Sequence, residues 1–73
     1  MDTISATHKR FGQRIKELRK RLGLTQEDLA FKVGVDRSYM GFVERGEKNP
    51  TLKRIISISK ALGVSLSELF NSI

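Results

Sequence analysis

The segment 25–46 contains two short helical patterns separated by a glycine. Thr25 can cap the first helix, because its hydroxyl can accept hydrogen bonds from the free amides of the first turn. The small side chain of Ala30 allows a second helix to cross closely at that point. Gly34 can end the first helix in a left-handed conformation, and Asp36 can cap the second. The spacing predicts a helix-turn-helix, a unit that typically places its second helix in the major groove of DNA.

The second helix of this unit, over about residues 37–45, carries the candidate base-reading positions. Met40 and Val43 share its inward face. The opposite face and the first turn hold the residues expected to contact base edges, namely Arg37, Ser38, Tyr39, Gly41 and Phe42. Arginine can bind guanine with two hydrogen bonds, and phenylalanine can contact a thymine methyl group. Glycine lowers helix propensity by roughly 1 kcal/mol relative to alanine. A close approach of the backbone to DNA would explain why Gly41 occurs in this helix in spite of that cost.

One amphipathic helix is predicted before the helix-turn-helix, over about residues 8–22. Its apolar positions recur at intervals of three and four, at Phe11, Ile15, Leu18 and Leu22. Residues 1–7 do not continue this pattern, and we expect them to be disordered or frayed. The outer face of the helix is basic, which is interpreted as a solvated surface, with direct DNA contact as the alternative.

Two further helices are expected after the helix-turn-helix. Thr51 can cap one that runs to about residue 62, with an inward face made of Leu52, Ile55, Ile58, Ser59 and Leu62. Ser65 and Glu68 have the spacing of a capping box for a short last helix that ends near Asn71. The sequence therefore predicts an all-α, compact five-helix single domain over residues 1–73, without strands.

Charge favours a polyanionic partner, since 14 Lys and Arg against 8 Asp and Glu give a net charge of +6. The chain has no cysteine, and no apolar run approaches the roughly 20 residues that span a bilayer. His8 is the only histidine, and we find neither a metal-ligand spacing nor a catalytic set. We expect a cytoplasmic protein that is not an enzyme, with no metal, cofactor, small-molecule ligand or membrane partner.

The helix-turn-helix resembles that of the phage repressor/Cro-type proteins, often called the Xre family. The family's signature Gln, Ala, Gly and inward apolar positions are matched by Gln26, Ala30, Gly34, Met40 and Val43. The similarity continues through LGLTQ, NPTL and ALGVSLSEL, and covers about residues 11–70. Within the family, the pattern TQEDLA…DRSYM…ERGEKNPTL is similar to the small controller proteins of restriction–modification systems. The resemblance implies a phage-repressor-like domain that binds double-stranded DNA.

The resemblance also implies roles for residues outside the base-reading face. Arg19 and Glu44 match a partly buried ion pair of the family. That pair joins the first helix of the domain to the second helix of the helix-turn-helix, which is the recognition helix. The expected phosphate contacts lie at the start of the first helix of the unit, at the end of its second helix, and in the following loop and helix start. They are Thr25, Gln26, Arg45, Lys48, Asn49, Thr51 and Lys53. Helix N-termini suit this role because their unpaired amides bind anions. Glu27 matches an acidic residue presented to RNA polymerase, but the second acidic position of that patch is here Phe31, which could instead contact another partner.

The C-terminal part carries more apolar residues than one inward face can bury. We expect residues 64–73, together with helix 51–62, to form a homodimer interface through Ile56, Val64, Leu66, Phe70 and Ile73. The alternative is that the last helix only caps the core. A dimer predicts a palindromic operator with half-sites about one helical turn apart, ~34 Å, or a multiple of it.

The function expected from these observations is transcriptional regulation by a sequence-specific homodimer that represses, activates or does both. The alternative is a DNA-binding antitoxin or accessory subunit whose main role is to bind a partner protein. RNA binding is less favoured, because Tyr39 and Phe42 lie on a helix and not on a stacking platform.

Overall fold

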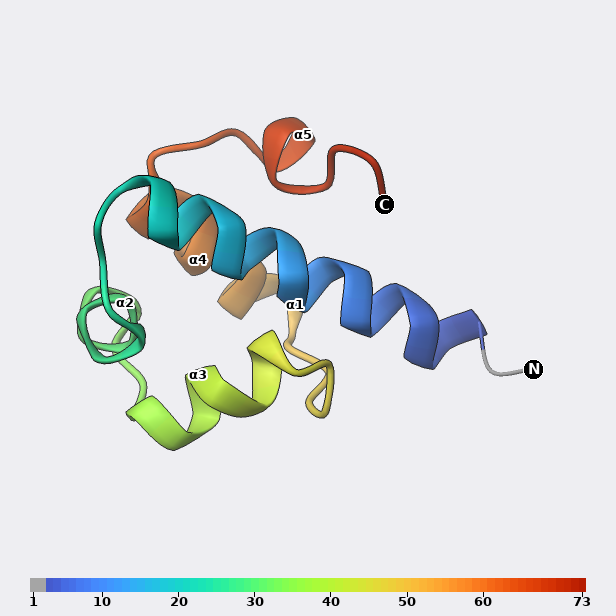
Figure 1. The fold of residues 1–73 in the computed structure, drawn as a ribbon, viewed down its shortest axis with the longest axis horizontal. Coiled ribbons are helices and arrows are strands. Elements are labelled where there is room, and N and C mark those ends of the chain that lie inside the picture. Colours follow the sequence, from blue (N-terminus) through green and yellow to red (C-terminus); the bar gives the residue numbers. More distant parts are fainter. Residues whose placement is uncertain (1–2) are drawn as a thin grey trace.

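The computed structural model describes residues 3–73, with side chains described from residue 5 onward. These residues form the five helices α1 (Thr3–Arg21), α2 (Gln26–Val33), α3 (Arg37–Glu44), α4 (Leu52–Leu62) and α5 (Leu66–Leu69). The absence of strands from this part of the chain confirms the all-α prediction. Helix α1 crosses the whole molecule, with α3 along one side of it and α5 along the other (Figure 1).

The helix starts follow from the predicted capping residues. At α2 the Asp28 amide donates to Thr25 Oγ1 at 3.0 Å, and the Thr25 amide donates to the Asp28 carboxylate at 2.9 Å. Ser65 and Glu68 form the same reciprocal box at α5. The amide hydrogen bonds hold the pKa values of Asp28 and Glu68 below their ordinary values, because they favour the charged carboxylates. The predicted caps at the starts of α3 and α4 are confirmed as well, at Asp36 and Thr51.

The two terminal helices differ from their predicted bounds. Helix α1 begins at Thr3, so it covers five of the seven residues that were expected to be frayed, and residues 1–2 lie outside the described part. Residues 3–7 contain neither Gly nor Pro, so the helix can extend without adding to the apolar face on which the prediction relied. Helix α5 ends at Leu69, two residues before the predicted end. No helix in residues 3–73 combines the length and apolarity needed to cross a membrane.

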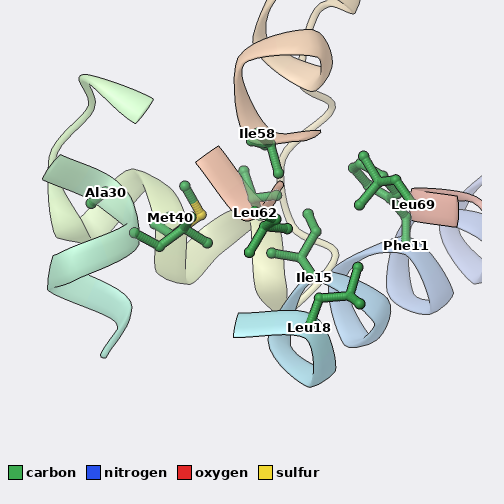
Figure 2. Close-up of a cluster of buried hydrophobic side chains, with 10 residues drawn as sticks. Phe11, Ile15, Leu18, Ala30, Met40, Ile58, Leu62 and Leu69 are labelled. Atoms are coloured by element: carbon green, nitrogen blue, oxygen red, sulfur yellow. The ribbon is translucent and has the colours of Figure 1, made fainter. Parts of the chain in front are cut away.

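The core draws on all five helices. Its buried apolar residues are Phe11, Ile15, Leu18, Leu29, Ala30, Met40, Val43, Ile58, Leu62 and Leu69. Figure 2 shows this cluster between the helices, with most of its members labelled. Two predicted core residues are wrong: Leu22 is 54% exposed and Leu52 is 67% exposed. Leu22 follows the last residue of α1, and Leu52 is the first residue of α4. At a helix end the helical period no longer determines which way a side chain faces.

Helices α1 and α3 cross with their backbones almost in contact. A methyl group added at Gly12 would overlap the carbonyl oxygen of Glu44 and lie 2.5 Å from that of Val43. A methyl group at Gly46, just after α3, would lie 2.8 Å from the Cα atom of Lys9. These two glycines therefore allow the C-terminal end of α3 to rest directly on α1.

Candidate nucleic-acid interface

A buried ion pair holds α3 on α1. Arg19 Nε donates to Glu44 Oε2 at 2.7 Å, and Arg19 Nη2 donates to Glu44 Oε1 at 3.0 Å. The third guanidinium nitrogen, Nη1, donates to the carbonyl oxygen of Leu24 at 2.8 Å. Arg19 is 8% exposed and Glu44 is 7% exposed, so the pair is two-pronged and largely removed from water. The predicted pair is confirmed.

The same carboxylate also fixes the start of α2. Gln26, the first residue of that helix, donates from Nε2 to Glu44 Oε1 at 3.1 Å. Glu44 thus connects α1, α2 and α3 through side-chain hydrogen bonds. Through this hydrogen bond Gln26 braces α3, and its contact with a DNA phosphate stays a prediction.

The outward side of α3 brings most of the predicted base-reading residues together. Arg37 and Ser38 are exposed in the first turn, Tyr39 is half-buried, and Phe42 is exposed one turn further on. The Phe42 ring has two cations near its face, since Arg45 Cζ lies 5.0 Å and Lys48 Nζ 5.7 Å from the ring centroid. Aromatic rings attract cations over their faces. Two of the predicted phosphate-binding cations therefore lie directly beside a predicted base-reading side chain.

The remaining predicted phosphate contacts lie at exposed positions. Asn49 and Lys53 are exposed, the first in the loop before α4 and the second in its first turn. The hydroxyls of Thr25 and Thr51 accept amide hydrogen bonds as helix caps, so these residues would offer their neighbouring amides more readily than their side chains. Arg45 also donates to Glu47 at 3.2 Å, in an exposed ion pair.

Gly41 lies in a different environment from the one expected. It is buried, and the side chains of Gln26 and Arg45 cover it. The prediction that Gly41 is exposed on the face that meets the groove is therefore wrong for the free chain. A base contact at Gly41 stays a prediction that requires these two side chains to move aside.

A basic hollow beside α3 includes residues that were not predicted to belong to the site. It has a volume of about 400 Å³ and is lined by Lys9, Gln13, Lys16, Gln26, Glu44 and Arg45. The first three come from α1, where their spacing of four and three residues places them on one helix face. Glu44 is paired with Arg19 and Arg45 with Glu47, so the remaining charges of the hollow are the cations of Lys9 and Lys16. In the sequence, the feature that points to these residues is the basic face of α1, for which a solvated surface is the favoured interpretation and DNA contact the alternative.

The predicted dimer surface remains accessible. Leu66, Phe70 and Ile73 are exposed, and Ile56 and Val64 are half-buried. Phe70 also stacks on Phe11, with ring centroids 4.9 Å apart, so part of it completes the core. The expected dimer contact stays a prediction.

Helix α2 presents a second exposed surface. Glu27 is exposed, and Phe31 is 86% exposed one turn further along the same helix. The expected contact of Glu27 with RNA polymerase stays a prediction.

The chain matches known proteins over most of its length. The family model described as helix-turn-helix, HTH_3, matches residues 15–69. The control protein C.MunI from Mycoplasma sp is 43% identical over 65 residues, which are 88% of this chain and 88% of that protein. The immunity repressor protein of Bacillus phage phi105 is 43% identical over 58 residues, 80% of this chain and 40% of the repressor.

Solved structures agree with the sequence matches. The crystal structure of the restriction-modification controller protein C.AhdI from Aeromonas hydrophila is 50% identical and superposes with a TM-score of 0.85, over 88% of this chain and 97% of that one. The controller protein C.Esp1396I is 41% identical with a TM-score of 0.76, over 81% and 77% of the two chains. The chain therefore belongs to the HTH_3 helix-turn-helix family, which is a family of DNA-binding transcriptional regulators of the phage repressor type and not of enzymes.

Proposed function

We propose that this chain is a sequence-specific regulator that binds a palindromic operator as a homodimer, in the manner of restriction–modification controller proteins. The observation that carries the proposal is the face of α3, where Arg37, Ser38 and Phe42 are exposed on a helix fixed by the buried pair of Arg19 and Glu44. A rigid exposed helix with cations beside it suits the major groove. Such a regulator acts where its DNA is, so we propose a cytoplasmic location.

Affinity and sequence choice come from different residues in this proposal. Phosphate contacts from Gln26, Arg45, Lys48 and Lys53 supply most of the affinity, and the basic hollow adds Lys9 and Lys16 of α1. The proposed base contacts in the first turn of α3 add sequence preference, with Arg37 as the main reader. A dimer bound across a promoter blocks polymerase, and one bound just upstream can recruit it through Glu27 or the exposed Phe31.

The experiment that tests the function is selection of DNA sites from a randomised duplex pool by the purified chain, repeated at several salt concentrations. We expect a palindromic site whose affinity falls steeply as salt rises. Weak, salt-sensitive binding to every duplex, with no enriched sequence, would contradict the proposal. That result would instead favour a DNA-binding subunit whose specificity belongs to a partner protein.

Arg37→Ala should reduce affinity for the selected operator and relax the preference at one base pair of each half-site. Loss of a two-pronged guanine contact corresponds to about 1–3 kcal/mol per half-site. Lys53→Ala is the matched control, because losing one phosphate contact should weaken binding to all sequences equally and lower the salt slope by about 1 per half-site. Titration of both variants against the operator and single-base variants checks this. An unchanged base preference for Arg37→Ala would exclude Arg37 as a reader.

Leu66→Ser should weaken the dimer without unfolding the chain, because Leu66 is 41% exposed in the monomer. Burying a leucine side chain at an interface contributes about 1.5–3 kcal/mol, so the dimer dissociation constant should rise at least tenfold. Leu52→Ser is the matched control, since Leu52 is 67% exposed and lies outside the proposed interface. Sedimentation equilibrium measures both constants. Equal dissociation constants for the two variants would remove Leu66 from the interface.

A further inference from the structure

Gly41 stands in the middle of α3 although the backbone there does not require a glycine. The glycines of the described chain with positive φ are Gly23, Gly34, Gly46 and Gly63, and Gly41 is not among them. Any other residue could therefore adopt its helical conformation, and alanine would favour the helix more strongly. The role of this glycine therefore depends on what occupies the space that a side chain would fill.

Two side chains from different parts of the fold occupy that space. A Cβ atom at residue 41 would lie 3.1 Å from Arg45 Nη1 and 3.3 Å from Gln26 Oε1. Both neighbours have further fixed contacts, because Gln26 donates to Glu44 and the Arg45 guanidinium lies over the ring of Phe42. To accommodate a methyl group, each would have to shift by a few tenths of an ångström, which would change the geometry of those contacts.

We propose that Gly41 is a positioning residue for DNA phosphate binding. By lacking a side chain it seats Gln26 and Arg45 side by side over α3, at the edge of the basic hollow that Lys9 and Lys16 complete. This proposal rests on the proposed function. It assigns the role of Gly41 to two phosphate-binding side chains and not to DNA approaching the helix backbone.

The geometry separates the effect of Gly41→Ala on folding from its effect on binding. The atoms that the new methyl group would meet are the ends of flexible side chains, so they can shift by a few tenths of an ångström while the helix stays in place. The variant should therefore fold with a melting temperature equal to or above that of the parent. Its affinity for DNA should fall about tenfold, the size expected when a hydrogen bond to a charged phosphate is weakened.

A double-mutant cycle at one low salt concentration tests whether Gly41 acts through these side chains. Gly41→Ala should weaken operator binding about tenfold in the parent, and by less than about twofold when Gln26→Ala and Arg45→Ala are already present. The control cycle pairs Gly41→Ala with Lys53→Ala, whose side chain is not among the nearest neighbours of Gly41, and the two losses should add. In the free variant, the NMR signals of the Gln26 side-chain amide should move, because its hydrogen bond to Glu44 changes.

Each other outcome overturns the inference. If Gly41→Ala binds DNA as tightly as the parent, Gln26 and Arg45 do not need a glycine at residue 41 to be positioned for binding. A loss of about tenfold that persists without Gln26 and Arg45 would mean that DNA itself approaches the backbone at Gly41. If the parent selects no DNA site, the proposed function fails and this inference with it. If the parent binds and the cycle is additive, only the inference about Gly41 fails.

Discussion

Arg19→Ala should lower the free energy of unfolding by ~3–5 kcal/mol, the effect of leaving one partner of a buried ion pair alone. Glu44 accepts three side-chain hydrogen bonds, and the substitution removes the two that come from Arg19. The Glu44 carboxylate, which is 7% exposed in the parent, would then keep only the side-chain hydrogen bond from Gln26. The carbonyl oxygen of Leu24 would lose its bond to Arg19 as well.

Urea unfolding of the variant, followed by circular dichroism, measures this loss. The matched control is Arg21→Ala, which removes an exposed arginine from the same helix end and should change stability by at most ~0.5 kcal/mol. Adding Glu44→Gln to Arg19→Ala should recover part of the loss, because it removes the stranded charge and keeps the shape of the side chain. Equal stabilities of Arg19→Ala and Arg21→Ala would refute the energetic role given to the pair.

Gly12→Ala should also destabilise the fold strongly, by more than ~2 kcal/mol, because overpacking a tight contact between two backbones cannot be relieved by a side-chain rotation. The added methyl group would meet the carbonyl oxygens of Val43 and Glu44, so α1 and α3 would have to separate. This separation would also strain the buried pair of Arg19 and Glu44.

Gly41→Ala provides the control for Gly12→Ala, since both replace a glycine within a helix and gain the same helix propensity of about 1 kcal/mol. At Gly41 the nearest atoms are side-chain ends, whereas at Gly12 they belong to the backbone. In thermal unfolding, the melting temperature of Gly12→Ala should therefore fall, whereas that of Gly41→Ala should rise or stay unchanged. A Gly12→Ala variant as stable as the parent would contradict the close crossing of α1 and α3.

Local chemistry explains which parts of the fold could be predicted. The caps at Thr25, Asp36 and Ser65 depend on hydrogen bonds within one turn, so residue types at short spacing were enough. Helical periodicity identified core positions along α1, α3 and α4 but failed at Leu22 and Leu52, where the helix ends or begins. The roles of Gly12 and Gly41 depend on what a second helix places above them, and no pattern along one helix contains that information.

The candidate site shows the same division. The pair of Arg19 and Glu44 followed from the family resemblance, because residues 25 positions apart have no local signature. Lys9 and Lys16 were not assigned to the site, since a basic helix face has the same sequence pattern whether it meets water or phosphate. Only their position beside Gln26 and Arg45 distinguishes them from the other basic residues of α1.

The contact of Gly12 with α3 has a consequence for the choice of operator. Together with Glu44, it leaves the recognition helix little freedom to tilt or slide on α1. In a dimer of the proposed kind, two such rigid readers would face the DNA at a fixed separation. The duplex would then have to bend or twist until its major groove meets both recognition helices. The free energy of this deformation depends on the base steps between the half-sites. Flexible steps at positions that no side chain touches would therefore belong to the recognised sequence.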